Sequence, residues 1–171
     1  MTNETFEKDI LPLKQPIYRY AFFMLKNKED ALDVSQEVLI KIWEKRAELE
    51  EVRNLRSWAI TITRNKCLDL IKSRKGDHYT WDENLDKHTE LTPFKQMSLK
   101  DEKNWINTLM NELPVNQKEV FYLRHFEDET YKEISESLDM DENKVKVYLH
   151  RARTFIKRSL EEKHDYGLKT G

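Results

Sequence analysis

The residues from Glu142 to Arg158 gather positive charge in a chain that is slightly acidic overall. The segment ENKVKVYLHRARTFIKR contains six Lys or Arg side chains, one His and one acidic residue. On a helix, the spacing i, i+4, i+7 and i+11 puts four of these on one face: Lys146, His150, Arg153 and Lys157. A solvated surface helix usually mixes charges of both signs. This face of one sign therefore favours binding to a polyanion such as nucleic acid over simple solvation.

A second group of side chains suits bases that have left a duplex. Trp58, Thr61, Asn65 and Lys72 lie at i, i+3, i+7 and i+14, so a ring, a hydroxyl, an amide and a cation share one side of a helix. Unpaired bases stack on aromatic rings and offer their edges to hydrogen-bonding groups. The stripe fits single-stranded nucleic acid, although Trp58 would also fit a hydrophobic core.

The stretch SQEVLIKIWEK has more apolar surface than a surface helix normally buries. At about 100° per residue, its apolar side chains spread over about 200° of the helix, whereas the usual apolar stripe is about 100° wide. These side chains are Val38, Leu39, Ile40, Ile42 and Trp43, and they are flanked by Asp33, Gln36, Glu37 and Lys41. Two interpretations are open: a central helix surrounded by its neighbours, or a helix with a partly exposed protein-docking face.

These segments must be positioned by helices, because hydrophobic periodicity predicts an all-α fold. Helices are expected at about 17–24, 30–46 and 54–73, with Gly76 closing the third. Shorter helices are expected from Trp105 to Leu113, around residues 120–123, at YKEISESL and in the basic segment. Residues 76–104 lose the helical period and carry seven acidic against four basic side chains, as expected of a flexible acidic linker. We predict two small domains, residues 1–75 and 105–164, joined by the linker 76–104 and followed by a tail, 165–171.

Within the second domain, two short helices form a helix-turn-helix pattern. The expected core of this unit is Ile134, Leu138, Met140, Val145 and Tyr148 or Leu149. In such units the second helix, here the basic one, lies in the DNA major groove. Asp139 occupies the turn position where glycine is common, and Asp tolerates the left-handed backbone conformation better than most residues.

Composition argues against several functional classes. Of 171 residues, 36% are charged and only three are Gly, which disfavours glycine-rich phosphate loops. The single Cys67 allows no internal disulfide or Cys-based zinc site and fits a reducing compartment. The five His residues lack metal-ligand spacing, and no nucleophile–base pair stands out, so we expect no metal, cofactor, small-molecule substrate or enzymatic activity. No apolar run approaches the ~18 residues of a membrane span, and no signal pattern begins the chain, so a cytoplasmic protein without membrane insertion is expected.

Two stretches resemble a known family. EDALDVSQEVLIKIWEK followed by NLRSWAITITRNKCLDLIKSR resembles region 2 of bacterial RNA polymerase sigma factors. LPVNQKEVFYLRHFEDETYKEISESLDMDENKVKVYLHRARTFIKRSL resembles region 4. The resemblance covers residues 5–161. Two such domains joined only by a linker are similar to the small extracytoplasmic-function (ECF) group.

The resemblance implies roles for the groups described above. The core-polymerase docking surface would comprise Asp33, Gln36, Glu37, Ile40 and Trp43. The minus-ten element would meet Asn65, the other members of its stripe and Arg56. The loop from about Ala47 to Arg56 resembles the one that captures a flipped base. The minus-thirty-five element would meet Arg124 and the basic helix, through Lys144, Lys146, Val147, His150, Arg151 and Arg153. An anti-sigma protein commonly covers these surfaces in the ECF group, and it is an expected partner besides core polymerase and promoter DNA.

A different class stays open at this point. The C-terminal segment alone would suit a stand-alone helix-turn-helix regulator that binds duplex DNA without polymerase. The excess apolar surface of the SQEVLIKIWEK helix and the Trp58–Asn65 stripe argue against that alternative.

Overall fold

The computed structural model describes residues 8–75 and 102–169, and all regular secondary structure in these ranges is helical. The first range contains, in order, the 3-10 helix η1 (Leu11–Leu13), α2 (Lys14–Leu25), α3 (Lys28–Glu44), the 3-10 helix η2 (Leu49–Glu51) and α4 (Leu55–Lys75). The second contains α5 (Glu102–Glu112), α6 (Val115–His125), α7 (Tyr131–Leu138) and α8 (Glu142–Lys169). The all-α prediction is thus confirmed for the described residues. The predicted linker and Gly76 lie largely outside them.

Local signals set the helix boundaries of the first range. Pro12 lies in η1 and Pro16 in the first turn of α2, where a missing backbone N–H costs little. Asn27 caps α3, because its side-chain oxygen accepts a hydrogen bond from the backbone N–H of Asp30 at 3.1 Å. Asn54 does the same for α4 by accepting from the N–H of Ser57 at 3.0 Å. The predicted start of α3 at Asp30 was therefore two residues late.

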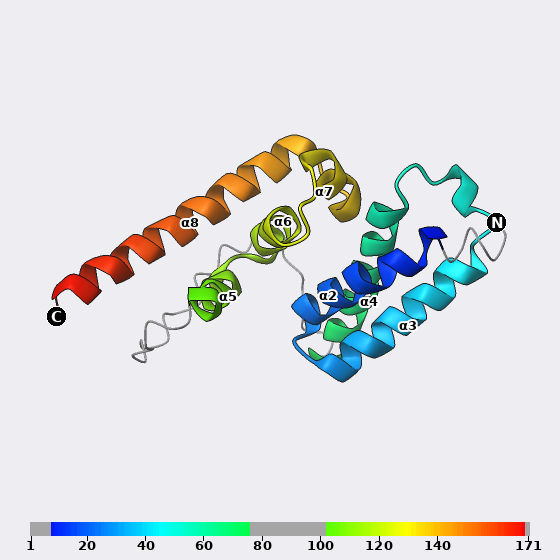
Figure 1. The fold of residues 1–171 in the computed structure, drawn as a ribbon, viewed down its shortest axis with the longest axis horizontal. Helices are drawn as coiled ribbons and strands as arrows, with labels where there is room; N and C mark the ends of the chain where they lie inside the picture. Colours follow the sequence, from blue (N-terminus) through cyan, green and yellow to red (C-terminus); the bar gives the residue numbers. More distant parts are fainter. Residues whose placement is uncertain (1–7, 76–101, 170–171) are drawn as a thin grey trace. The chain divides into compact units, whose positions relative to one another are not determined.

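Helices α2, α3 and α4 pack against one another around a shared core (Figure 1). Each helix supplies side chains that are almost completely buried, such as Ile17 from α2, Ile42 from α3 and Ala59 from α4. Cys67 is also fully buried and is a free thiol. This packing fixes the rotation of α3 and α4 about their own axes and so decides which of their residues face solvent.

In the second range, α6 packs against α8, and α5 also contacts α8 (Figure 1). Buried apolar side chains come from all three helices, including Leu109 of α5, Val120 and Leu123 of α6, and Leu149 of α8. Helix α8 is longer than the basic segment and runs to Lys169, so the predicted tail begins inside it.

The described residues group into two compact units. Residues 8–75 and 132–141 form the first, and residues 102–131 and 142–169 form the second. The first boundary follows α4, near the predicted end of the N-terminal domain. The second domain is predicted as one continuous segment, residues 105–164. Residues 132–141 of that segment group with the first unit, so its continuity stays a prediction.

The turn that follows α7 has the conformation expected of a helix-turn-helix. Asp139 has φ of 51°, in the left-handed region. The backbone N–H of Met140 donates to the carbonyl oxygen of Ser135 at 3.1 Å, and the Ser135 hydroxyl donates to the carbonyl oxygen of Met140 at 2.6 Å. These bonds stop α7 and let α8 begin at Glu142. Asp139 thus fills the position where the sequence predicts left-handed backbone.

Candidate protein-binding and nucleic-acid interfaces

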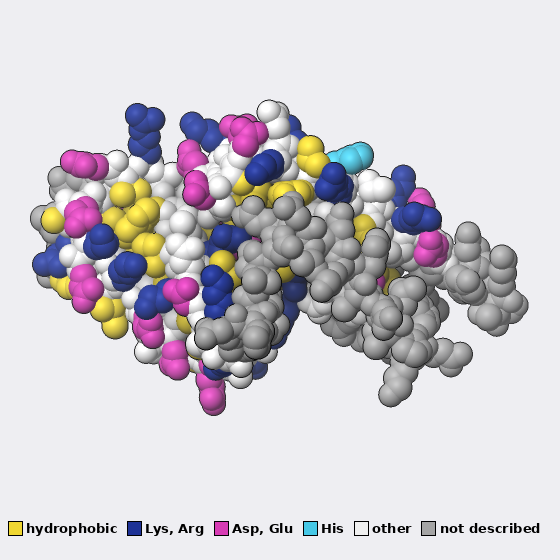
Figure 2. Space-filling view, turned by 180° about the vertical axis from the view of Figure 1, so that it is seen from behind, with side chains coloured by type: hydrophobic (Ala, Val, Ile, Leu, Met, Phe, Trp, Pro, Cys, Tyr) yellow, Lys and Arg dark blue, Asp and Glu magenta, His cyan; other side chains and the backbone are white. Residues whose placement is uncertain are grey.

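Helix α3 carries apolar side chains that the core does not cover. Val38 and Ile42 are fully buried, whereas Ile40 is 57% exposed and Trp43 is 38% exposed. Part of the wide apolar arc therefore faces solvent, which favours the partly exposed face over the fully surrounded helix. Figure 2 shows how hydrophobic surface lies between side chains of both charges on one face of the molecule. Such exposed apolar side chains within a polar rim are typical of a protein-binding surface.

The polar residues predicted beside this arc are exposed as well. Asp33, Gln36 and Glu37 all face solvent. The ammonium of Lys66 on α4 lies 2.6 Å from a carboxylate oxygen of Glu37, an exposed ion pair that contributes little to stability. A partner that engages Glu37 would therefore compete with Lys66.

The residues of α4 predicted to meet the minus-ten element are only partly accessible. Asn65 and Lys72 are exposed, and Arg56 and Thr61 are half-buried. The Thr61 hydroxyl donates to the backbone oxygen of Ser57, one turn earlier, at 2.9 Å. Trp58 is half-buried and packs against the core of the first unit. Its ring therefore supports the fold in addition to any contact with a base.

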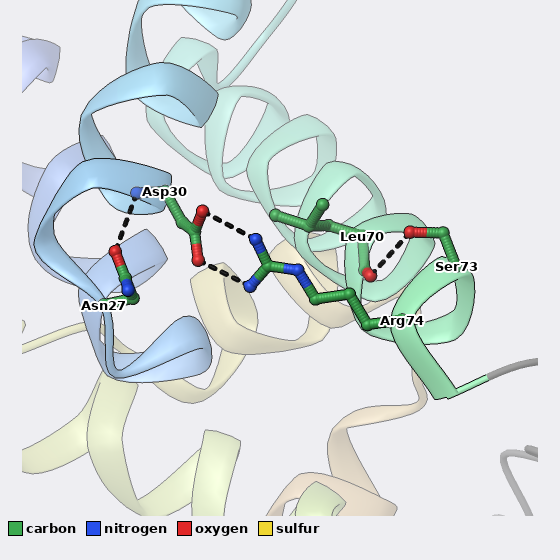
Figure 3. Close-up of polar contacts among 5 residues, drawn as sticks. All are labelled: Asn27, Asp30, Leu70, Ser73 and Arg74. Atoms are coloured by element: carbon green, nitrogen blue, oxygen red, sulfur yellow. Dashed lines mark hydrogen bonds and ion pairs between the residues drawn. The ribbon is translucent and has the colours of Figure 1, made fainter.

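A bidentate ion pair joins the end of α4 to the start of α3 (Figure 3). The two terminal nitrogens of the Arg74 guanidinium lie 2.6 and 2.8 Å from the two carboxylate oxygens of Asp30. The hydrogen bonds and positive charge of Arg74 hold the pKa of Asp30 below its usual value. The pair orients the last turn of α4, next to the exposed Lys72.

Helix α8 carries its apolar and its basic residues on different faces. Its apolar stripe is buried: Val145, Leu149, Ala152 and Ile156. The residues predicted to meet DNA are all exposed: Lys144, Lys146, Val147, His150, Arg151 and Arg153. An exposed basic face backed by a buried apolar face presents the cations on a rigid support, which suits recognition of a duplex.

The basic character of α8 does not continue beyond Arg158. Lys157 lies 3.8 Å from Glu161, and Arg158 lies 3.4 Å from Glu162, each one turn along the helix. The sequence shows these two acids four positions after the two cations, but they lie just beyond the basic segment. Within the described part of α8, the cations that precede Lys157 form the stronger candidate surface.

Arg124, predicted to meet DNA, also holds the loop after α6. Its guanidinium donates to the backbone oxygen of Glu129 at 2.8 Å and lies 5.7 Å from the centre of the Tyr131 ring. The backbone N–H of Glu129 donates to the carbonyl oxygen of Leu123 at 3.0 Å. Substituting Arg124 would therefore disturb this loop as well as any phosphate contact.

One residue at this surface escaped sequence reasoning. His125, the last residue of α6, accepts a hydrogen bond at its Nε2 atom from Nε of Arg153, at 3.1 Å. Partial burial lowers the pKa of His125, and the charges of Arg153 and Arg124 lower it further. No signal in the sequence links two residues 28 positions apart on different helices.

The described residues contain no cluster of three or more His, Cys, Asp or Glu side chains arranged to hold a metal ion. Among the helices described, none combines the length and hydrophobicity that a bilayer crossing demands.

Known proteins match both parts of the chain. The family model for sigma-70 region 2 matches residues 10–76, and that for sigma-70 region 4 matches residues 103–156. The RNA polymerase sigma factor SigV of Bacillus subtilis is 33% identical over 150 residues, which cover 86% of each chain. The ECF RNA polymerase sigma factor SigX of the same organism is 24% identical over 165 residues, covering 93% of this chain and 85% of that protein.

A solved structure has the same fold. The sigma factor RpoE of Bartonella quintana, in complex with the anti-sigma factor NepR, superimposes with a TM-score of 0.69 over 92% of this chain and 98% of that one, at 21% identity. A stand-alone helix-turn-helix regulator is not favoured, because such a protein would need no region 2. The chain belongs to the ECF group of RNA polymerase sigma factors.

Proposed function

We propose that the protein binds core RNA polymerase, recognises the minus-thirty-five and minus-ten elements of its promoters, and promotes DNA melting at the start of transcription. The observation that carries this proposal is the presence of sigma regions 2 and 4, in that order, on one chain. The exposed apolar residues of α3 and the basic face of α8 supply surfaces of the kinds that these tasks need.

The core-polymerase contact is assigned to α3. Ile40 and Trp43 would be its apolar anchors, because they are the exposed members of an otherwise buried arc. The rim would comprise Asp33, Gln36 and Glu37, whose charge and polarity select the partner and its orientation.

The minus-ten contact is assigned to α4 and the loop before it. The amide of Asn65 can donate and accept at once, so it suits the edge of an unpaired base. Lys72 and Arg56 would meet the backbone of the melted strand, and Thr61 and the accessible part of Trp58 would complete the surface.

The minus-thirty-five contact is assigned to the start of α8. Lys146 and Arg151 would reach guanine O6 and N7, and Val147 would offer an apolar contact to a thymine methyl group. Lys144, His150 and Arg153 would meet phosphates or flanking bases, and Arg124 would approach from α6.

We also propose that a partner protein regulates this protein, that it acts in the cytoplasm, and that it catalyses no reaction. RpoE of Bartonella quintana is held by the anti-sigma factor NepR, and an anti-sigma protein is a suitable partner here because exposed apolar side chains need cover when polymerase is absent. Transcription takes place in the cytoplasm of a bacterium, where the free thiol of Cys67 would stay reduced.

The direct test is transcription by core polymerase with and without this protein, with sequencing of the RNA start sites. The upstream sequences of those starts define the cognate minus-thirty-five element. Lys146→Ala should then cost about 1–3 kcal/mol at the cognate element and relax sequence preference there. Lys157→Ala should instead weaken binding to all sequences alike and lower the salt slope by at most about one. Starts that are the same with and without the protein would contradict the proposed function.

A further inference from the structure

The contact between His125 and Arg153 joins α6 to the basic face of α8 in the second unit. His125 stands at the end of α6, and its ring lies 4.4 Å from that of Phe121, measured between ring centres. On the other side, its Nε2 atom accepts the hydrogen bond from Nε of Arg153. The imidazole ring thus contacts the ring of Phe121 and also hydrogen-bonds Arg153, a cation of the proposed DNA-binding surface.

The hydrogen bond requires an uncharged imidazole. An Nε2 atom that accepts from arginine carries no proton, so the ring proton must be on Nδ1. Partial burial and the charges of Arg153 and Arg124 all lower the pKa of His125, which favours the neutral ring. Protonation would remove the acceptor and place a second cation against the guanidinium.

An arginine side chain has many rotamers, and fixing one of them costs conformational entropy. The bond to His125 uses Nε and leaves the four N–H donors of the two terminal nitrogens to bind phosphate oxygens. An arginine that is already oriented before DNA arrives loses less entropy on binding.

We propose that His125 is a positioning residue that holds Arg153 in the orientation with which it contacts a DNA phosphate. The inference rests on the proposed DNA-binding role of α8 and adds to it a residue outside the recognition helix. Because a phosphate contact is independent of sequence, any DNA duplex tests it.

Other charges also face the imidazole. His125 and Arg153 line a surface hollow of about 310 Å³ together with Phe121, Ile156, Lys157, Leu160 and Glu161. Lys157 and Glu161 lie near each other, so their charges partly cancel, and Arg124 is the nearest charge on α6. The charges around His125 are therefore mostly positive.

The test compares the binding of the full-length protein and its variants to a fluorescein-labelled mixed-sequence DNA duplex by anisotropy at low salt. At about pH 8, where the imidazole is neutral, His125→Ala should weaken binding about threefold, which is modest for one hydrogen bond. His125→Gln keeps an acceptor and should recover most of the loss. In an Arg153→Ala background, His125→Ala should cost nothing further.

The pH dependence distinguishes positioning from simple charge. If His125 positions Arg153, the advantage of the native protein over His125→Ala should shrink as the pH falls from about 8 through the lowered pKa of His125, because the protonated ring no longer accepts. If His125 merely adds positive charge, that advantage should grow instead. Protonation of His150 affects the native protein and His125→Ala alike, so it cancels in the ratio of their dissociation constants.

Three results would overturn the inference: an advantage that grows in acid, an equal loss from His125→Ala with and without Arg153, or no loss from Arg153→Ala alone. Thermal melts by circular dichroism identify variants that fail to fold, and for these the conservative His125→Gln variant decides. Lys144→Ala, which removes another exposed cation proposed to meet phosphate, serves as the reference for the proposed function. If it weakens binding while Arg153→Ala does not, only the positioning role fails, and if neither weakens binding, the proposed DNA face itself is wrong.

Discussion

Replacing Ile40 with alanine should weaken binding to core RNA polymerase by about three- to ninefold. Ile40 is 57% exposed on α3, so that fraction of its surface remains to be covered by a partner. Complete burial of such a side chain is worth about 1.5–3 kcal/mol, and alanine keeps one of its four carbons, which leaves a loss of about 0.6–1.3 kcal/mol. This area-based value is a lower estimate, because an anchor in a closed pocket commonly costs about 2 kcal/mol or more when truncated.

The same substitution should hardly affect folding. An exposed side chain contributes little to the folded state, so the free energy of unfolding should change by less than about 0.5 kcal/mol. Leu11→Ala is the matched control, because Leu11 in η1 is 51% exposed and loses the same three carbons. For Trp43→Ala, the matched control is Phe22→Ala, since both side chains are 38% exposed.

The assay is competition between each unlabelled variant and the fluorescently labelled native protein for a limiting amount of core enzyme, with thermal melts in parallel. Ile40→Ala should compete poorly and melt normally, and Leu11→Ala should match the native protein in both measurements. Equal competition by Ile40→Ala and Leu11→Ala would refute the docking face. A large drop in the melting temperature of Ile40→Ala would mean that the side chain supports the fold instead.

Two further predictions concern α4. Asn65→Ala should reduce open-complex formation, measured by permanganate reactivity of promoter thymines, and leave the affinity for core polymerase unchanged; unchanged melting at every promoter would move the base contact to the loop before α4. Arg74→Met should lower the melting temperature slightly at neutral pH by removing the ion pair with Asp30. Because Arg74 depresses the pKa of Asp30 below 3.8, the stabilisation is present above that pH and is lost as the pH falls through the depressed pKa, so the two melting temperatures should converge in strong acid. If the melting temperatures of the native protein and Arg74→Met still differ in strong acid, the loss of stability comes from packing and not from the ion pair.

Much of the fold could be predicted because each helix carries its own signal. The buried stripe from Val145 to Ile156 follows from spacing alone, and so does the exposed part of the α3 arc. The start of α3 was misplaced because the prediction began at the periodic segment, whereas Asn27 caps the helix just before it. Caps are set by one side chain and one backbone N–H, which leave little trace in a hydrophobic pattern.

Contacts between helices could not be predicted in the same way. The hydrogen bond from Arg153 to His125 and the ion pair of Arg74 with Asp30 depend on how two helices are rotated and offset against each other. Trp58 illustrates the same limit. Its position on the polar stripe left exposure and burial in the core both open, and the packing of α4 against its neighbours brings the ring partly against the core.

The two surfaces proposed on the first unit share one mechanical support. Ile40 on α3 and Asn65 on α4 face solvent, while Ile42 and Ala59 of the same helices are buried in a common core. A polymerase bound to α3, as proposed, would therefore hold α4 in a fixed orientation, because close-packed helices cannot rotate independently without opening cavities. Polymerase binding at α3 would then orient the promoter-contacting residues of α4 without any movement inside the unit. It also follows that a cavity at Ile42 should impair both tasks together, whereas substitutions at exposed positions should separate them.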